Sequence, residues 1–277
     1  MSTLVFFHAH PDDEAIATGG TMAALAAAGH RVVLVTATSG DLGEVPDGFL
    51  DEGETLAQRR AIEVAEAGRV LGVARHQFLG YLDSGMAGEP TNERPGCFAA
   101  ADVEEAAGRL ATILEEESAD VVVAYDEHGG YGHPDHVQVH RVGLRAGALA
   151  GTAKVYMATQ DRDFLASLAN DHADSAWAPP AEMAEQMQAM GEPGSRISTE
   201  VDVSGWLDAK RGAMRAHPSQ IPDDSFFLAM PDEIFALVWS KEWYIQAHPP
   251  VPDPFPGPRQ TSLLDEDPSV ATDSLRP

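Results

Sequence analysis

The first two-thirds of the chain alternate between short apolar runs and longer amphipathic segments, which predicts alternating strands and helices. Buried strands are expected at residues 4–7, 32–37, 76–79, 121–125 and 155–158. Helices are expected at about 15–29, 54–71, 102–117 and 134–149. Gly29 and Gly72 stand where helices should end, and Asp102 stands where one should begin. This order is typical of βαβ units, so we predict an α/β fold with a Rossmann-like, mostly parallel sheet and helices on both faces.

The pattern changes after residue 158. Residues 159–200 are rich in Asp, Ala, Met and Pro, with one helical stretch at 182–190, and we interpret them as an insertion that caps a site. A helix is expected at about 206–216. The apolar segment 235–245 should pack on the core and close a single domain, residues 1–245.

A Pro-rich, acidic tail follows this domain. Residues 246–277 contain eight prolines with acidic side chains between them. Such a composition has little apolar surface to bury, so the tail is expected to be extended or disordered and to stay out of the core.

Composition narrows the class of function. The net charge of -26 would repel the phosphates of nucleic acids and anionic membrane surfaces, so neither is an expected partner. There is no apolar run of about 18 residues that could span a membrane, and no basic region precedes the first apolar run as in a secretory signal. Cys97 is the single cysteine, which excludes an internal disulfide and favours the cytoplasm. Any metal should then be held by His and carboxylate side chains.

A first group of chemically active residues follows the first predicted strand at once: His10-Pro11-Asp12-Asp13-Glu14. In open α/β sheets, ligands bind at the carboxyl ends of strands. His10 and Asp13 are three residues apart across a strand-to-helix turn, so both can converge on one metal ion, and this donor pair suits zinc. The alternative is that the three acids only favour the positive end of a helix. A cap needs one carboxylate rather than three, which favours a metal site.

A second group, residues 131–136 (YGHPDH), follows the strand predicted at 121–125. Pro134 is well placed as the first residue of a helix. His133, His136 and His140 then fall within eight residues. Spacing alone does not say which of them binds a metal, and a histidine bonded within the core is the alternative for each. Two such groups at two strand ends predict one divided metal site.

Other chemistries fit the sequence less well. The glycines at Gly19-Gly20 and Gly129-Gly130 match neither the dinucleotide nor the P-loop spacing, and acids occupy the turn where a pyrophosphate would bind. There is no G-x-S-x-G motif, and Cys97 has no obvious base nearby in sequence. Catalysis by metal-activated water is the better fit.

The two groups together resemble the PIG-L/LmbE family of zinc-dependent N-deacetylases. The resemblance continues through the segments 56–63, 78–86 and 210–217, and it spans roughly residues 3–245. It implies a Rossmann-like fold in which His10, Asp13 and His136 hold zinc, with Fe²⁺ as an alternative metal. It also implies that Asp12 is the general base that activates the water on zinc.

The resemblance implies roles for four further residues. Tyr131 would stabilise the oxyanion together with zinc, and a protonated His133 would supply charge and help the amine to leave. Asp83 would orient His133 and raise its pKa. Arg60 would contact substrate, unless it simply pairs with Glu63 on the same helix.

The expected reaction is hydrolysis of the N-acetyl amide of an N-acetylglucosamine-type amino sugar or glycoside. Two actinobacterial branches of the family share the motifs: the mycothiol-pathway N-acetylglucosaminyl-inositol deacetylase and the mycothiol S-conjugate amidase. An amidase acting on such a larger conjugate, and a deacetylase that tailors an amino-sugar natural product, are therefore the alternatives. A non-catalytic metal- or sugar-binding protein is a remote one, because a binding module needs neither Asp12 nor His133. The partner is a small molecule, and an enzyme of this size is compatible with a homo-oligomer.

Overall fold

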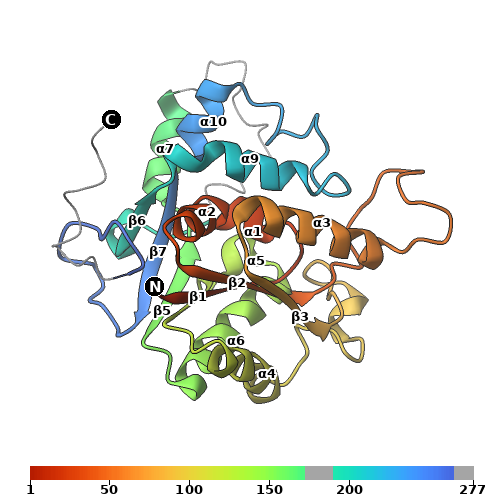
Figure 1. The fold of residues 1–277 in the computed structure, drawn as a ribbon, viewed down its shortest axis with the longest axis horizontal. Coiled ribbons are helices and arrows are strands. Elements are labelled where there is room, and N and C mark those ends of the chain that lie inside the picture. Colours follow the sequence, from red (N-terminus) through yellow and green to blue (C-terminus); the bar gives the residue numbers. More distant parts are fainter. Residues whose placement is uncertain (172–189, 265–277) are drawn as a thin grey trace.

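The computed structural model describes residues 1–171 and 190–264, and a seven-stranded mixed sheet forms its centre (Figure 1). The strands lie in the order β3-β2-β1-β4-β5-β7-β6. Their bounds are β1 Thr3–His8, β2 Arg31–Thr38, β3 Arg75–Tyr81, β4 Val121–Tyr125, β5 Lys154–Thr159, β6 Thr199–Asp202 and β7 Lys241–His248. Strands β1 to β5 are parallel, and β7 runs antiparallel between β5 and β6. The five strands predicted from the sequence are all present, and the α/β class is confirmed.

Helices cover both faces of the sheet, as predicted (Figure 1). Their bounds are α1 Asp13–Ala17, α2 Gly19–Ala27, α3 Leu56–Leu71, α4 Val103–Glu116, α5 Gly129–Gly132, α6 Pro134–Ala150, α7 Arg162–Asp171, α9 Leu207–Arg215 and α10 Asp232–Trp239. Helices α2, α3 and α9 pack together on one face, and α4 packs on α6 on the other. Short 3₁₀ helices lie at Pro90–Glu93, Gly194–Arg196 and Ser204–Trp206.

The single helix expected at 15–29 is wrong, because the chain breaks at Thr18 into α1 and α2. The Thr18 hydroxyl lies 2.9 Å from Nε2 of the buried His8. The backbone N–H groups of Gly20 and Thr21 donate to the Glu242 carboxylate at 2.9 and 2.8 Å. A carboxylate at a helix start satisfies N–H groups that have no partner within the helix. Because this cap comes from β7, the local sequence could not reveal a second helix start.

The apolar segment 235–245 packs on the core as expected, but it contains two elements. It supplies the end of α10 and, after Ser240, most of β7. Phe235 and Tyr244 are both buried. Pairing with β5 and β6 makes the second half a strand, which is a tertiary effect that residue preferences alone do not decide. The helical stretch expected at 182–190 lies, apart from Met190, outside the described residues.

The start of the tail differs from the expectation of a segment that stays out of the core. Strand β7 continues to His248, beyond the expected boundary at 245. Leu263 is 1% exposed and belongs to the core. Arg259 forms ion pairs with Asp161 and Glu200. Apolar packing of Leu263, the ion pairs of Arg259 and backbone hydrogen bonds of Gln260 therefore hold residues 249–264 against the domain, although the segment is rich in proline.

One buried ion pair joins three distant segments beneath the site. Lys210 of α9, 1% exposed, lies 2.5 Å from the Glu242 carboxylate of β7. The same ammonium donates to the carbonyl of Ile16 in α1 at 2.7 Å. A buried charge is tolerated only when it is paired and hydrogen-bonded in this way. Lys210 thus fixes α1, and with it the loop after β1, relative to the C-terminal part of the chain.

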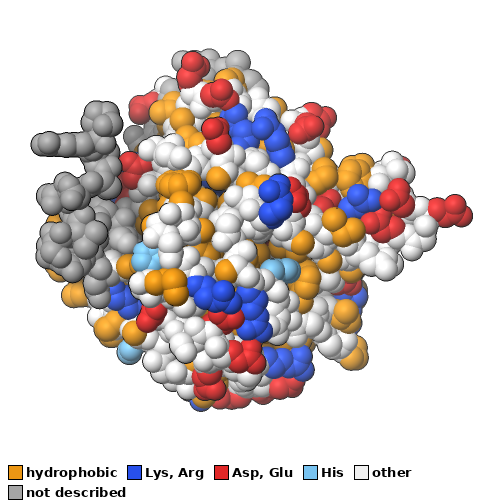
Figure 2. All heavy atoms as spheres, viewed as in Figure 1, with side chains coloured by type: hydrophobic (Ala, Val, Ile, Leu, Met, Phe, Trp, Pro, Cys, Tyr) orange, Lys and Arg blue, Asp and Glu red, His pale blue; other side chains and the backbone are white. Residues whose placement is uncertain are grey.

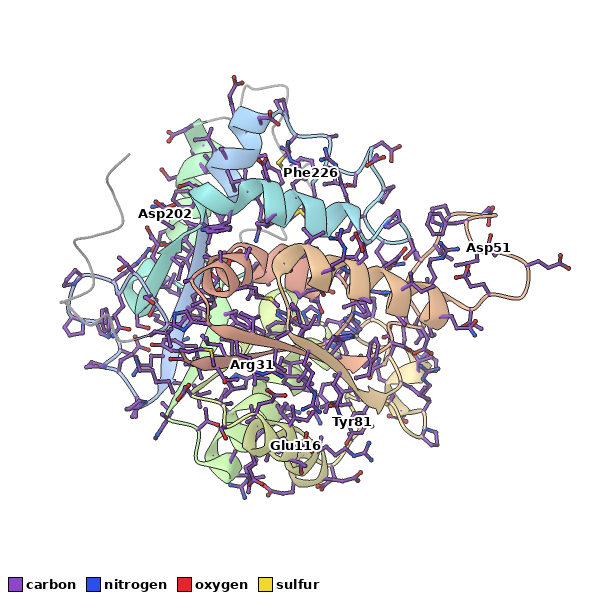
Figure 3. All side chains as sticks on the ribbon, in the orientation of Figure 1. Arg31, Asp51, Tyr81, Glu116, Asp202 and Phe226 are labelled. Atoms are coloured by element: carbon purple, nitrogen blue, oxygen red, sulfur yellow. The ribbon has the colours of Figure 1, made fainter. Side chains whose placement is uncertain are left out.

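The surface agrees with the acidic composition. Asp and Glu side chains are spread over the face seen in Figure 2, with Lys and Arg side chains among them. Asp51 lies in the loop that extends away from the sheet before α3, and Tyr81 lies at the carboxyl end of β3 (Figure 3). Among the described residues, no helix combines the length and the apolar character that a membrane crossing requires.

Close packing of α6 on β4 gives a stability prediction. A Cβ at Gly143 would lie 2.4 Å from the Cβ of Ala124, so Gly143→Ala should destabilise the fold by about 1–3 kcal/mol through overpacking. The control is Gly108→Ala in α4, where no atom would meet the new Cβ within 4 Å. That change should stabilise by up to ~1 kcal/mol through helix propensity. Denaturant unfolding measures both, and equal stability of the two variants would contradict the described α6–β4 contact.

Candidate active site

The candidate site lies at the carboxyl ends of β1 and β4, which are neighbours in the sheet. From β1 the chain winds outward through β2 and β3, whereas β4 and β5 continue on the other side. Ligands bind at such a switch in strand order because the loops after the two central strands separate there. Residues 9–12 form the loop after β1 and lead into the start of α1, and residues 126–128 with α5 and residue 133 follow β4.

His10, Asp13 and His136, the three residues that the family resemblance implies as metal ligands, lie close together. Oδ2 of Asp13 lies 3.5 Å from Nδ1 of His10 and 3.4 Å from Nε2 of His136. Nε2 of His136 is buried and has no hydrogen-bond partner. A buried imidazole nitrogen that faces a carboxylate and a second imidazole fits a divalent metal ion, which would satisfy all three groups. His140 is turned elsewhere, with Nδ1 3.0 Å from the backbone oxygen of Tyr125.

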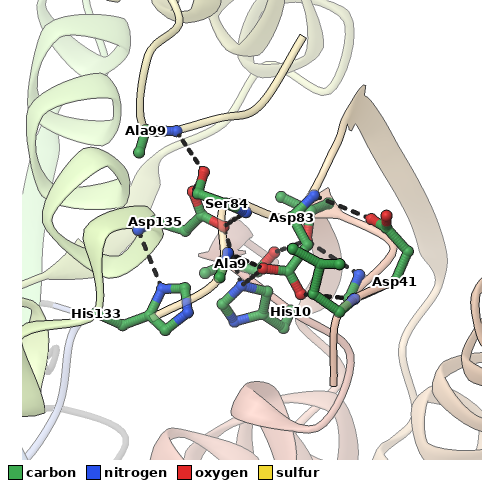
Figure 4. Close-up of polar contacts among 12 residues, drawn as sticks. Ala9, His10, Asp41, Asp83, Ser84, Ala99, His133 and Asp135 are labelled. Atoms are coloured by element: carbon green, nitrogen blue, oxygen red, sulfur yellow. Dashed lines mark hydrogen bonds and ion pairs between the residues drawn. The ribbon is translucent and has the colours of Figure 1, made fainter. Parts of the chain in front are cut away.

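Two further contacts orient these imidazoles. Nε2 of His10 lies 3.1 Å from the carboxylate of Asp135, which is fully buried and accepts bonds from the backbone N–H and the hydroxyl of Ser84 (Figure 4). Nδ1 of His136 lies 3.2 Å from the carbonyl of Gly129. Partners on the far nitrogen fix the ring and leave the other nitrogen free for a metal. Asp135 has no role in the predicted site, although its place within the second motif was a usable signal.

Asp12 and Asp13 are adjacent, yet their environments shift the two pKa values in opposite directions. Burial raises the pKa of Asp12 to about 6, and the Arg60 guanidinium, 3.2 Å away, opposes this only in part. For Asp13, burial also favours the neutral form, but His136 and His10 outweigh it and hold the pKa well below the usual value. One carboxylate is therefore suited to accept a proton near neutrality, and the other to remain charged against a cation.

Arg60 is buried against Asp12 rather than open to solvent. It is 3% exposed and donates to the carbonyls of Gly40, at 3.0 Å, and of Pro11. The alternative of a helical pair with Glu63 is wrong, because the Glu63 carboxylate accepts bonds from the N–H and hydroxyl of Ser219 at 3.0 and 2.6 Å. Contact between Arg60 and substrate stays a prediction.

Asp83 reaches the site from the loop after β3, and it faces His10. Its carboxylate lies 3.6 Å from Nε2 of His10 and accepts bonds from the backbone N–H groups of Leu42 and Gly85 at 3.3 and 2.9 Å. Ligand atoms of His10, Asp83, His133 and Asp135 all lie within 4.8 Å of one another, and the role of Asp83 in orienting His133 stays a prediction.

His133 is described best as a neutral imidazole. Burial lowers its pKa to about 4, and the neighbouring His10 and His136 add to this effect, which outweighs the opposing charges of Asp135 and Asp83. Asp83 does raise the pKa of His133, as expected, but in this arrangement not enough to keep the imidazole protonated near neutrality. Nδ1 of His133 accepts the backbone N–H of Asp135 at 3.1 Å, so the single proton of the ring lies on Nε2.

Tyr131 borders the site from α5. Its side chain is half exposed, and its ring centroid lies 4.9 Å from that of His136 and 6.1 Å from that of His133. Gly130 in the same short helix has φ 68° and ψ -93°, a conformation that a side chain would disfavour. The glycine thus shapes the turn that brings the tyrosine over the histidines.

A second cluster of ligand-type groups lies near this loop, but an arginine side chain already pairs with its carboxylates. Glu127, His128 and Glu192 place ligand atoms within 4.8 Å of one another. The Arg196 guanidinium contacts both glutamates, at 2.7 and 2.8 Å. Because an arginine already compensates the two charges, this cluster serves to connect the loop before α5 with the segment after residue 190.

A buried His/Asp set at the switch point of an α/β sheet, with a separate carboxylate of raised pKa beside it, defines a metal-dependent hydrolase. Residues 5–147 match the family described as PIG-L, GlcNAc-PI de-N-acetylase. The chain belongs to this family, as its two motifs predicted, and it hydrolyses the carbon–nitrogen bond of a linear amide.

Individual proteins agree with this assignment. The chain is similar to a 1D-myo-inositol 2-acetamido-2-deoxy-alpha-D-glucopyranoside deacetylase of Nocardiopsis dassonvillei, at 43% identity over 280 residues, covering 93% of this chain and 98% of that protein. A protein with the same name from Salinispora arenicola is 42% identical over 259 residues, covering 88% and 84%. Among solved structures, the N,N'-diacetylchitobiose deacetylase of Pyrococcus horikoshii is similar in fold, with a TM-score of 0.56, 23% identity and coverage of 88% and 83%.

Metal retention tests the convergence of the three ligand-type groups. His136→Ala removes the unpartnered nitrogen and should weaken metal binding by at least ~100-fold, because changes to surrounding partners alone cost roughly 10–100-fold. His140→Gln is the matched control on the same helix, since His140 bonds to a backbone carbonyl and should leave affinity unchanged. Metal analysis after dialysis against graded chelator compares the variants. Equal retention by both would contradict the assignment of His136.

Proposed function

We propose that the protein is a zinc-dependent deacetylase of the N-acetylglucosaminyl-inositol that its relatives' names specify. The observation that carries the proposal is the convergence of His10, Asp13 and His136 beside Asp12. Relatives that bear this name are 40–43% identical over most of both chains, which supports the substrate. The free amino sugar and acetate are the products.

His10, Asp13 and His136 would hold the zinc ion. Two imidazoles and one carboxylate are a usual zinc set with a position left open, and Fe²⁺ also accepts these donors. Zinc bound there would lower the pKa of a water molecule and polarise the amide carbonyl. The buried carboxylates around the site exceed the cations supplied by the chain, so a divalent ion also improves the local charge balance.

Asp12 is the proton acceptor in this proposal. Its carboxylate takes a proton from the attacking water, and its raised pKa suits that task near neutrality. The amine that leaves needs one proton, and the protonated Asp12 carries one. A carboxyl group with a pKa of about 6 can accept and return this proton within one turnover, so the protons balance without a second acid.

His133 and Tyr131 supply hydrogen-bond donors. With Nδ1 occupied by a backbone N–H, neutral His133 donates from Nε2 to the oxygen that gains charge as the carbonyl is attacked. The Tyr131 ring lies beside His136 at the mouth of the site, where its hydroxyl serves the same oxygen. Arg60 holds Asp12 in place, and contact with a sugar hydroxyl is its additional proposed role.

Release of the free amine, with acetate measured beside it, decides between the proposed reaction and its alternatives, because cleavage of a larger acyl conjugate frees no acetate at that bond. The protein is stripped with chelator, reloaded with zinc or Fe²⁺, and supplied with N-acetylglucosaminyl-inositol, simple N-acetylglucosaminides or a mycothiol S-conjugate. Zinc-restored release from the inositol glycoside is expected. Faster cleavage of the S-conjugate would favour the amidase, and metal binding without any cleavage would contradict an enzymatic role on this panel.

Asp12→Asn tests the proton acceptor. The amide cannot accept the proton, so kcat should fall by about 10²–10⁴-fold while zinc content and KM stay near those of the parent. Asp51→Asn is the control, because the Asp51 side chain is 88% exposed in the loop before α3. Steady-state acetate release with metal analysis separates the two. Activity close to that of the parent in Asp12→Asn would remove this residue from the mechanism.

The pH profile tests the environment of Asp12. The raised pKa means that the carboxyl is protonated and inactive below about pH 6, so kcat/KM should fall as the pH decreases through that value. The Arg60 charge lowers the Asp12 pKa, and Arg60→Gln should therefore shift the acidic limb to higher pH. An unshifted limb in an active, zinc-loaded Arg60→Gln variant would show that the guanidinium does not act on the titrating group.

A further inference from the structure

Asp12 has an unusual backbone conformation for a residue with a side chain. Its φ is 118° and its ψ is -31°, and among the described non-glycine residues only Ser118 shares a positive φ. Such a conformation is disfavoured and persists only where surrounding contacts enforce it. The carbonyl of Asp12 accepts bonds from Ala15 and Ile16 at 3.0 and 3.2 Å, which fixes one side of the residue. A contact on its N–H side must complete the constraint.

Glu14 supplies that contact. One oxygen of its buried carboxylate, Oε2, accepts the backbone N–H of Asp12 at 3.0 Å. In a capping box, the residue before the helix also bonds back to the helix with its side chain. Asp12 does not do so: its side chain makes no capping bond at the start of α1. Glu14 therefore bonds to the backbone N–H of Asp12, and the Asp12 carboxylate remains available to Arg60 and to the site.

His217 in turn fixes Glu14. Its Nε2 lies 2.6 Å from the other oxygen of Glu14, Oε1, and both side chains are fully buried. His217 follows α9, where its N–H donates to Met214 and its carbonyl accepts from Gln220 and Ile221. The imidazole is thus held by a structured turn more than two hundred residues away in sequence. Neither Glu14 nor His217 contacts the converging group His10, Asp13 and His136 in the described interactions.

We propose that Glu14 and His217 are a positioning pair for the general base: Glu14 enforces the backbone of Asp12 that aims its carboxylate at the reacting water, and His217 fixes Glu14. This rests on the proposed function of Asp12. A purely structural pair would join α1 to α9 and affect only stability. A positioning pair also controls turnover, because a displaced base lowers the rate of the step in which it takes the proton.

The test compares variants that keep or remove the two bonds. Glu14→Gln keeps an oxygen for the Asp12 N–H, and His217→Gln keeps a donor for Glu14, so both should retain kcat within about threefold of the parent. Glu14→Leu and His217→Leu remove the bonds, and kcat should fall at least ~10-fold with KM and zinc content unchanged. Glu14→Asp keeps the charge, but its side chain is one methylene too short to make both bonds, so kcat should fall to the same extent. This variant replaces the Leu variants if they do not fold.

Ser219→Ala is the control for stability alone. It removes a buried hydrogen bond to Glu63 between α3 and the same turn after α9, without a contact to Asp12. It should lower the midpoint of unfolding and leave kcat unchanged. Parental kcat in a folded, zinc-loaded Glu14→Asp or His217→Leu variant would overturn the proposal. So would a loss of activity that parallels a loss of zinc.

Failure of the proposed reaction and failure of the positioning pair give different results. If the zinc-loaded parent releases no acetate from the substrate panel, the proposed function fails. A crystal structure of zinc-loaded Glu14→Asp then tests the positioning directly. Residue 12 should leave its positive φ in that variant and keep it in Glu14→Gln, and an unchanged φ in Glu14→Asp would overturn the inference.

Discussion

The structure depends on the cationic and hydrogen-bonding partners of carboxylates that are removed from water. Five acidic side chains meet at the carboxyl edge of the sheet: Asp12, Asp13, Glu14, Asp83 and Asp135. Each one has a different set of partners, drawn from an arginine, imidazoles, backbone N–H groups and a serine hydroxyl. An unpaired buried charge costs several kcal/mol, so these partners determine where the surrounding loops can lie. The loops after β1, β3 and β4 are therefore positioned by electrostatics as much as by apolar packing.

The same compensation shifts the pKa values of two adjacent residues in opposite directions. Asp13 faces two imidazoles and is held ionised, whereas Asp12 faces one arginine that only partly offsets its burial. One dipeptide thus offers a carboxylate that stays ionised and a carboxyl group whose pKa is raised to about 6. The difference arises from which side of the turn each carboxylate occupies, and the backbone of Asp12 sets that side.

Much of the site could be predicted from the sequence because its parts are local. Each motif follows an apolar strand directly, and neighbouring parallel strands bring their carboxyl ends together, so the meeting of His10 with His136 follows from fold class. The break at Thr18 and the strand β7 could not be predicted, since both depend on partners far along the chain. The pairing of Glu14 with His217 was hidden for the same reason. The neutral state of His133 depends on the sum of several nearby charges, which no spacing pattern encodes.

The bond between Glu242 and the start of α2 joins residues that are 222 positions apart, and the Glu14–His217 pair spans 203. The first motif therefore leaves the ribosome well before the residues that support it. Until the turn after α9 is synthesised, the Glu14 carboxylate lacks its His217 partner and remains solvated. Contacts of such long range also slow folding, since the intervening chain must be ordered first. The loop after β1 thus reaches its final form late in biosynthesis, because a nascent chain that stops short of α9 and β7 lacks the contacts that fix it.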